Sequence, residues 1–287
     1  MIAPGAPIAV VAPAGAFDPA RLQAGVAIAR AHGRDLTLFP DLLRPVRYLA
    51  SSDEQRASQL VEALTDPGWT AVWIARGGFG ITRILHALET VELPARPVIG
   101  FSDATALFAA LWRRGVGPLV HGPVLHSLSA TDEGSIEHLF DMLAGRPAAP
   151  LEGETWVAGV AEGPIVGGNL ATLTSLCGTP WQLDARDAVL VLEEVGEYAY
   201  RIDRMLQQLT DAGVFDRVAG VAVGQLVDCR LPADATFTFR DVMLDHLGRL
   251  GVPVVGDLPI GHGPANRAFV WGTRGTLRDG RLEQSDV

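Results

Sequence analysis

The chain of 287 residues contains no lysine, so arginine supplies all of its permanent side-chain positive charge. Acidic side chains outnumber basic ones, and the net charge is −10. Binding to the phosphate backbone of a nucleic acid depends on clustered positive charge, which this composition does not favour. We therefore expect no nucleic-acid partner.

Cysteine is also scarce. The two cysteines, Cys177 and Cys229, are too few for a disulfide framework and lack the C-x-x-C spacing of a metal or redox motif. The seven histidines show neither H-x-x-x-H nor H-x-H spacing. We expect a protein that binds no metal ion and whose activity survives chelators.

Long apolar runs are missing as well. No uninterrupted apolar segment reaches the roughly 18 residues of a membrane-spanning helix. The apolar N-terminal segment has no basic stretch and is interrupted by prolines and glycines, so it makes a poor signal peptide. These absences predict a cytoplasmic protein that does not associate with a membrane.

The composition, with 48% hydrophobic and 20% charged residues, is that of an ordered globular chain. In the N-terminal half, short apolar runs alternate with amphipathic stretches. We expect strands at 8–12, 35–39, 71–75 and 98–101, and helices at 19–32, 54–64 (capped by Asp53), 81–88 and 104–114. Strands separated by helices in this way predict an α/β fold with an open, mostly parallel sheet flanked by helices.

A stretch rich in glycine, proline and small residues, from 144 to 164, divides the chain. We predict an N-terminal domain at 1–145, a linker at 146–164 and a smaller C-terminal α+β domain at 165–287. In the C-terminal part we expect strands at 188–192 and 220–223, helices at 202–212 and 239–250, and a hairpin turn at Asp279-Gly280.

A serine lies at the predicted strand-to-helix junction Gly100-Phe101-Ser102-Asp103. A sharp turn at this point lifts a serine hydroxyl out of the sheet, and the start of the following helix can stabilise an oxyanion. The second glycine of the G-x-S-x-G hydrolase motif is absent. The alternative is that Ser102 only caps the next helix, and this segment taken alone favours capping.

A glycine-rich loop, Arg76-Gly77-Gly78-Phe79-Gly80, also follows a predicted strand. It is neither a P-loop nor a dinucleotide-binding fingerprint, so we expect no nucleotide cofactor. Loops at the carboxyl ends of neighbouring strands in an open α/β sheet converge on one crevice. The glycine loop can therefore share a site with Ser102.

Two further segments carry ionisable side chains. Glu193 and Glu194 end a run of four apolar residues, and they are either functional or simple surface partners of Arg201 and Arg204. His262 stands between two glycines, which leaves its ring accessible. Most isolated histidines are structural, so the histidine alone indicates little.

Taken together, these segments resemble the motifs of the LD-carboxypeptidase family, which includes the microcin C immunity peptidases. The RGG-aromatic-G loop, the G-x-S-D turn, the L-E-[ED]-x-x-E-x-x-Y-x-I-D-R segment and the P-x-G-H-x-x-x-N segment occur in the family's order. The resemblance implies a catalytic triad of Ser102, Glu193 and His262, and it implies no cofactor.

The resemblance also implies oxyanion donors at the backbone N–H of Asp103 and of Gly77 or Gly78. Side chains alternate along a strand, so only one of two adjacent glutamates can meet the histidine. The family's L-E step aligns with Leu192-Glu193. Glu194 is then expected to face solvent or an arginine such as Arg201.

Carboxypeptidases of this family cleave the bond between the L-centre of meso-diaminopimelate and the terminal D-alanine of murein tetrapeptide during cell-wall recycling. We expect this activity, with a small peptide substrate and a homodimeric assembly. Two alternatives stay open: hydrolysis of an aminoacyl amide linked to an adenylate, as in microcin immunity, and a catalytically inactive small-molecule binding protein. The sequence does not select the residue that binds the substrate carboxylate from among Arg76, Arg204 and Arg240.

Overall fold

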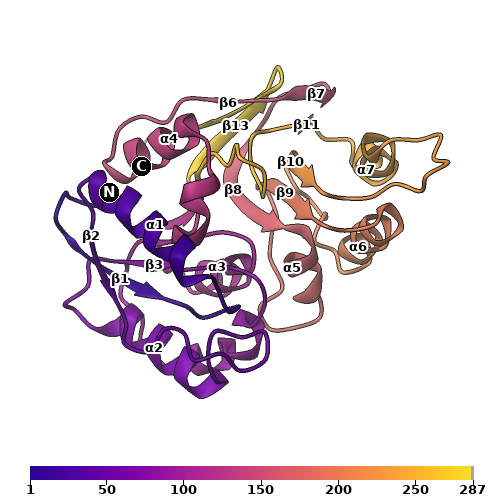
Figure 1. Ribbon diagram of the computed structural model, residues 1–287. Helices are drawn as coiled ribbons and strands as arrows, with labels where there is room; N and C mark the ends of the chain where they lie inside the picture. The colour runs from indigo at the N-terminus through magenta and orange to yellow at the C-terminus, as the bar shows by residue number, and fades with distance from the viewer. Residues whose placement is uncertain (286–287) are drawn as a thin grey trace.

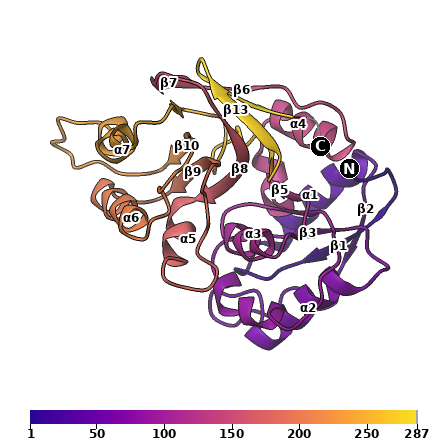
Figure 2. The same ribbon diagram turned by 180° about the vertical axis from the view of Figure 1, so that it is seen from behind.

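The structure, a computed structural model, describes residues 1–285, which form two β-sheets with helices packed against them (Figure 1). The N-terminal part forms one lobe, coloured indigo to purple, and most of the C-terminal part forms a second lobe, coloured pink to orange. The view from behind shows the same two lobes side by side (Figure 2).

The first sheet has six strands in the order β12-β5-β4-β3-β1-β2. Their bounds are β1 (Pro7–Val11), β2 (Asp35–Leu38), β3 (Ala71–Ile74), β4 (Val98–Gly100), β5 (Leu119–His121) and β12 (Phe269–Trp271). The first five strands are parallel, as predicted, and β12 pairs antiparallel with β5. The C-terminal part of the chain therefore returns to complete the N-terminal sheet, which the sequence did not predict.

Helices cover both faces of this sheet. On one face α1 (Pro19–Ala31) packs against the 3₁₀ helix η3 (Leu125–Ala130), and α4 (Glu133–Leu143) lies at the end of α1, where His32 stacks on Phe140. On the other face lie α2 (Asp53–Thr65), α3 (Ala104–Arg113) and the 3₁₀ helices η1 (Ile81–Arg83) and η2 (Leu85–Leu88). With both faces covered, every side chain of β3 is buried, as is usual for a central parallel strand.

Two local predictions were wrong. The helix expected at 54–64 begins at Asp53, and its N-cap is Ser52, whose hydroxyl accepts from the N–H of Gln55. Asp53 instead forms ion pairs with Arg56 and Arg83. The single helix expected at 81–88 is two short 3₁₀ helices, η1 and η2. Three β-branched residues near its start, including Ile81, weaken the α-helical preference.

The second sheet has eight strands in the order β6-β14-β13-β8-β9-β10-β11-β7. Their bounds are β6 (Leu151–Glu152), β7 (Glu154–Val157), β8 (Ala161–Asn169), β9 (Val189–Val195), β10 (Gly220–Val227), β11 (Val254–Gly256), β13 (Arg274–Arg278) and β14 (Arg281–Gln284). Strands β8 to β11 are parallel, and the remaining pairs are antiparallel. The predicted class is confirmed: an α/β fold with an open, mostly parallel N-terminal sheet flanked by helices, followed by a C-terminal part of strands and helices.

The segment 146–164, which we predicted as a linker, is not free of secondary structure. It contains β6, β7 and the first residues of β8, and residues 146–150 alone pass between the lobes without a regular element. The domain boundaries stay a prediction. The hairpin turn is confirmed, because Asp279 and Gly280 join β13 to β14 with φ of 49° and 75°, the two positive values of a type I′ turn.

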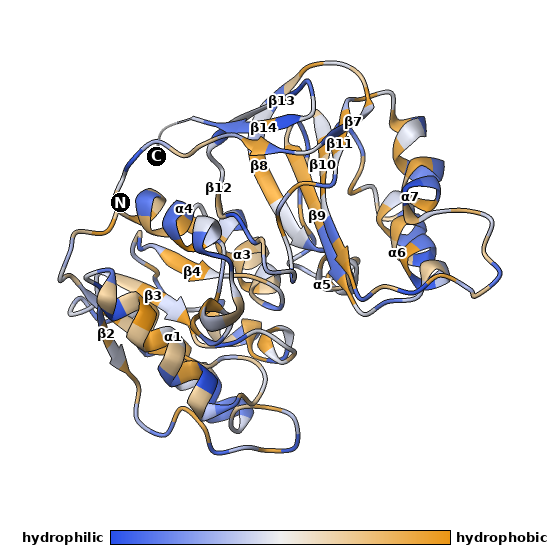
Figure 3. Ribbon diagram, turned by 45° about the horizontal axis from the view of Figure 1, so that its top comes forward, coloured by the Kyte–Doolittle hydropathy of each residue, from blue (hydrophilic) through white to orange (hydrophobic). Residues whose placement is uncertain are grey.

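Three helices accompany the second sheet: α5 (Leu170–Ser175), α6 (Ala199–Asp211) and α7 (Phe239–Leu247), the last extended by η4 (Gly248–Leu250). Helix α6 buries Ile202, Leu206 and Leu209, which lie on one face at helical spacing. Figure 3 shows the consequence: the central strands are orange and apolar, while α6 and α7 also carry blue, polar positions. The carboxyl ends of β4 and β9 meet between the lobes, where Ser102 and Glu193 lie.

Candidate active site

Ser102 lies in a tight turn between β4 and α3, with its backbone in the left-handed region at φ 63°. Gly100 makes the turn possible, since a Cβ there would lie 2.9 Å from side-chain atoms of both Ala104 and Ile74. Residues held in this region carry strain of about 1–3 kcal/mol, and they cluster at functional sites. The N-cap of α3 is Asp103 and not Ser102, so the capping alternative for the serine is wrong.

The three residues that the family resemblance selected lie in hydrogen-bonding contact. The hydroxyl Oγ of Ser102 lies 3.0 Å from Nε2 of His262, and Nδ1 of the same ring lies 2.7 Å from Oε2 of Glu193. With the ring proton on Nδ1, the imidazole donates to the carboxylate and accepts from the hydroxyl. The serine comes from the first lobe, and the other two residues come from the second.

The loop that carries His262 is held by a buried amide. Oδ1 of Asn266 accepts a hydrogen bond from the N–H of Gly261, at 3.3 Å, and the backbone N–H of Asn266 donates to the hydroxyl of Ser135. The His262 ring also contacts the ring of Phe101, with centroids 4.7 Å apart. These contacts fix the orientation of the imidazole toward Ser102.

Charge around His262 alters its titration. Burial alone would lower the pKa of the imidazole, but the neighbouring carboxylate of Glu193, with a contribution from Glu194, raises the pKa above its ordinary value. Glu193 is fully buried, so its charge is poorly screened and acts strongly on the ring. The pair is therefore suited to hold a proton on His262 once the ring has accepted one.

Glu194 lies elsewhere than predicted. We expected it to face solvent or an arginine, but it is 2% exposed and is bonded to Asn169 and the start of α5. Its carboxylate accepts from Nδ2 of Asn169 and from the backbone N–H groups of Ala171 and Val195. Burial raises the pKa of Glu194, and these hydrogen bonds oppose the shift. Arg201 pairs with Glu197 instead.

The glycine loop lies directly against the nucleophile candidate. A Cβ on Gly77 would lie 2.9 Å from Cβ of Ser102 and 3.1 Å from its Oγ, so only glycine fits. The carboxylate of Asp103 accepts from the N–H of Ile81, at 2.9 Å, and so ties the serine turn to this loop. Burial raises the pKa of Asp103 to about 6, against the opposing effects of that hydrogen bond and of Arg56.

Three backbone N–H groups beside Ser102 have no acceptor in the part of the chain that the structure describes. They belong to Gly77, Gly78 and Asp103, the positions predicted as oxyanion donors. Unpaired N–H groups next to a nucleophile are typical of an oxyanion hole. Their role stays a prediction.

One residue that the sequence motifs did not indicate is His121, which ends β5 beside the serine strand. It is fully buried, stacks on Phe269 with ring centroids 4.6 Å apart, and has no hydrogen-bond partner for either nitrogen within residues 1–285. Burial lowers its pKa to about 4, although Glu193 opposes this shift. Its one signal in the sequence is its place at the carboxyl end of an apolar strand.

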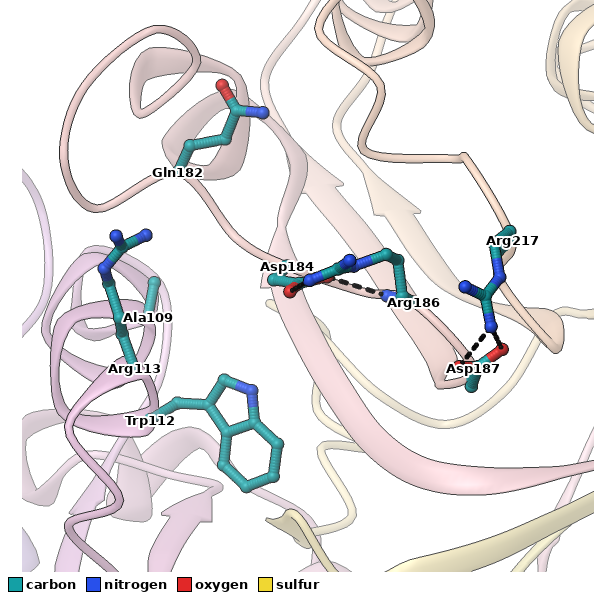
Figure 4. A pocket seen from close by; sticks show the side chains of 8 residues that line it. All are labelled: Ala109, Trp112, Arg113, Gln182, Asp184, Arg186, Asp187 and Arg217. Atoms are coloured by element: carbon teal, nitrogen blue, oxygen red, sulfur yellow. Dashed lines mark hydrogen bonds and ion pairs between the residues drawn. The ribbon is translucent and has the colours of Figure 1, made fainter.

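Ser102 lines two cavities, of about 260 and about 370 Å³. A larger cavity of about 680 Å³ lies away from them, between α3 and the chain around residues 182–187 (Figure 4). Two of its arginines are already paired, Arg186 with Asp184 and Arg217 with Asp187, and no serine, cysteine or histidine lines it. The chemistry of the site therefore lies at Ser102.

Within the described residues, no three histidine, cysteine, aspartate or glutamate side chains gather closely enough to hold a metal ion. No helix among residues 1–285 has both the length and the apolar character needed to cross a bilayer.

Serine hydrolases typically have a serine at a strand-turn-helix junction. The serine is hydrogen-bonded to an imidazole, which in turn is hydrogen-bonded to a buried carboxylate. Family models match both parts of the chain: the LD-carboxypeptidase N-terminal domain over residues 8–122 and the LD-carboxypeptidase C-terminal domain over residues 162–277. The chain belongs to the LD-carboxypeptidase family, and carboxypeptidase-type hydrolase activity follows from this membership.

Individual relatives agree with the family. A putative carboxypeptidase of Synechocystis sp. is 40% identical, over 96% of this chain and 92% of the relative. The murein tetrapeptide carboxypeptidase of Pseudomonas aeruginosa is 35% identical, over 96% of this chain and 94% of its own length.

Solved structures agree as well. The muramoyltetrapeptide carboxypeptidase from Oxalobacter formigenes superposes with a TM-score of 0.85 at 27% identity, covering 97% of this chain and 100% of that chain. MccF in complex with glutamyl sulfamoyl guanosine reaches a TM-score of 0.85 at 18% identity, covering 100% of this chain and 97% of that one, and shows the shared fold.

Proposed function

We propose that the protein is a serine LD-carboxypeptidase that hydrolyses the bond between the L-centre of diaminopimelate and the terminal D-alanine of murein tetrapeptide. The observation that carries the proposal is the hydrogen-bonded series Ser102, His262, Glu193 in a member of this family. The substrate is supported by the name of the Pseudomonas aeruginosa relative, a murein tetrapeptide carboxypeptidase.

In the first half of the reaction, Oγ of Ser102 attacks the scissile carbonyl carbon, and its proton passes to Nε2 of His262, 3.0 Å away. The carbonyl oxygen becomes an oxyanion, which the unpaired N–H groups of Asp103 and of Gly77 or Gly78 stabilise. Glu193 holds the ring in the required tautomer and stabilises the imidazolium.

In the second half, the imidazolium gives its proton to the amine of the leaving D-alanine as the C–N bond breaks, which leaves an ester on Ser102. A water molecule then loses a proton to the neutral ring and attacks the ester carbonyl. His262 returns that proton to Oγ, and the shortened peptide leaves with a free carboxylate. No cofactor takes part in these steps.

We also propose that the reaction takes place in the cytoplasm and that the protein acts as a homodimer. Both statements rest on the family resemblance. Light scattering on a size-exclusion column tests the assembly, since a mass near twice 30.4 kDa is expected.

The test of the function is incubation of the protein with murein tetrapeptide and, separately, with a stable aminoacyl-adenylate analogue. Mass spectrometry reads the release of D-alanine or of the nucleotide part. Release of D-alanine alone supports the LD-carboxypeptidase, and release from the adenylate analogue alone supports the microcin-immunity alternative. Binding without turnover of either compound supports the inactive binding protein and contradicts both enzymes.

A further inference from the structure

The two cavities that open on Ser102 differ in charge. The cavity of about 370 Å³ contains His262 together with Arg21, Arg76 and His126. The cavity of about 260 Å³ contains no basic side chain, and its polar residues include Glu194, Asn169, Thr172 and Ser175. A substrate whose scissile carbonyl sits at Ser102 therefore has one part in a basic cavity and the other in a neutral-to-acidic cavity.

The position of His262 decides which part of the substrate lies in which cavity. The imidazolium must protonate the leaving amine, so the leaving amino acid has to lie on the side of the ring. His262 lines the basic cavity and does not line the other one. The leaving D-amino acid of an LD-peptide therefore enters the cavity that contains the arginines.

Arg76 is placed to bind an anion there. It is half-buried at the end of β3, immediately before Gly77, and Nη1 donates to the carbonyl oxygen of Ala16. Within residues 1–285, the bond to Ala16 is the one hydrogen bond of this side chain, so Nη2 and Nε have no acceptor and no carboxylate pairs with the guanidinium. A guanidinium that is held in place by one N–H can use its other N–H donors to bind a carboxylate in a fixed orientation.

Although the chain has a net charge of −10, the described side chains that line this cavity include two arginines and no carboxylate. Arg21, on the exposed side of α1, adds a second permanent charge. Burial, and after it the charges of Arg21 and Arg76, lower the pKa of His126, while Asp18 opposes the shift. Burial is the larger cause, and the two arginines act in the same direction because their positive charges face the ring.

The other arginines that the sequence left as candidates lie elsewhere. Arg204 is stacked over Tyr200 on α6, and Arg240 is bonded to Glu154 and stacked over Trp156. Neither lines a cavity that contains Ser102.

We propose that Arg76, supported by Arg21, binds the terminal carboxylate of the leaving D-amino acid and so restricts the enzyme to the last peptide bond of its substrate. This inference rests on the proposed function, because it assigns the leaving group of that reaction to one cavity. The acyl part, with its L-centre, then lies in the cavity lined by Glu194 and Asn169.

The test compares two substrates that differ in one charge: murein tetrapeptide ending in D-alanine and the same peptide ending in D-alanine amide. Wild type, Arg76→Gln, Arg21→Gln and the control Arg204→Gln are measured on both. Wild type is expected to prefer the free acid. Arg76→Gln should lose about 10- to 100-fold in kcat/KM on the acid, as for a lost charge-assisted hydrogen bond, and little on the amide.

Arg21→Gln should lose about two- to fivefold on the acid, because an exposed charge is screened, and Arg204→Gln should match wild type on both peptides. A merely structural effect of Arg76 on the glycine loop would lower the rates on both peptides equally and would overturn the inference. Equal rates of wild type on acid and amide would also overturn it, while leaving the proposed peptidase intact. A wild-type protein that cleaves neither peptide contradicts the proposed function and the inference together.

Discussion

Glu193 and Glu194 are consecutive residues at the end of β9, yet their carboxylates lie in opposite directions and have different partners. Glu193 faces His262 at 2.7 Å, whereas Glu194 accepts hydrogen bonds from Asn169 and from two backbone N–H groups. The alternation of side chains along a strand separates them.

This separation predicts different outcomes for the two amide variants. Glu193→Gln should lose at least about two to three orders of magnitude in kcat, because the amide no longer stabilises the imidazolium. Glu194→Gln should keep much more of its kcat. Its free energy of unfolding should fall by about 1–3 kcal/mol, because the new amide N–H₂ group would face N–H donors that now bond to the carboxylate. Kinetics on one LD-peptide and urea unfolding measure both effects. If Glu194→Gln is the variant with the crippled kcat, the roles of the two glutamates are reversed.

Ser102→Ala should abolish hydrolysis and leave the free energy of unfolding nearly unchanged. Among residues 1–285, His262 is the one hydrogen-bond partner of Oγ, and the serine does not cap α3. The measurement is turnover of murein tetrapeptide alongside thermal unfolding. Loss of a helix cap would instead cost about 1 kcal/mol of stability and little activity. An alanine variant with near wild-type turnover would rule out Ser102 as the nucleophile.

The raised pKa of His262 predicts the acid side of the pH profile. The ring must be neutral to accept the Ser102 proton, so kcat/KM falls as the pH drops through this pKa, and the midpoint should lie above the ordinary value of about 6.5. Removing the carboxylate charge in Glu193→Gln should move the titration of His262 to lower pH. The pH profile of the wild type and NMR titration of the ring measure the two effects. A midpoint well below 6.5 would contradict this assignment.

His121 should make the protein sensitive to acid. Its pKa of about 4 in the folded state is below the ordinary value of about 6.5, so the unfolded chain takes up the proton first and stability falls as the pH drops below about 6.5. His121→Phe keeps the stacking shape and removes this proton. Its stability relative to wild type should rise by about 1.5 kcal/mol between pH 6.5 and pH 5. The exposed His86→Gln serves as control, and urea unfolding at each pH measures the difference; no change in the difference would contradict the prediction.

The sequence by itself determined the elements and the motifs. The central strands β1, β3 and β4 were predictable because both of their faces are covered, which makes them short apolar runs, and the turn at Asp279-Gly280 was predictable because both residues tolerate positive φ. The order of the motif segments indicated the LD-carboxypeptidase family, and the matches to the family's N-terminal and C-terminal domain models confirm it.

The tertiary structure alone decided which side chains meet. Ser102 and His262 are 160 residues apart and on different lobes, and no local preference encodes their contact at 3.0 Å. The same holds for the return of β12 to the first sheet, the burial of Glu194 and the position of His121, because each depends on packing between distant segments. A sequence pattern predicts whether a side chain is buried or exposed. Which distant residue it contacts is decided only when the two sheets and their helices pack together.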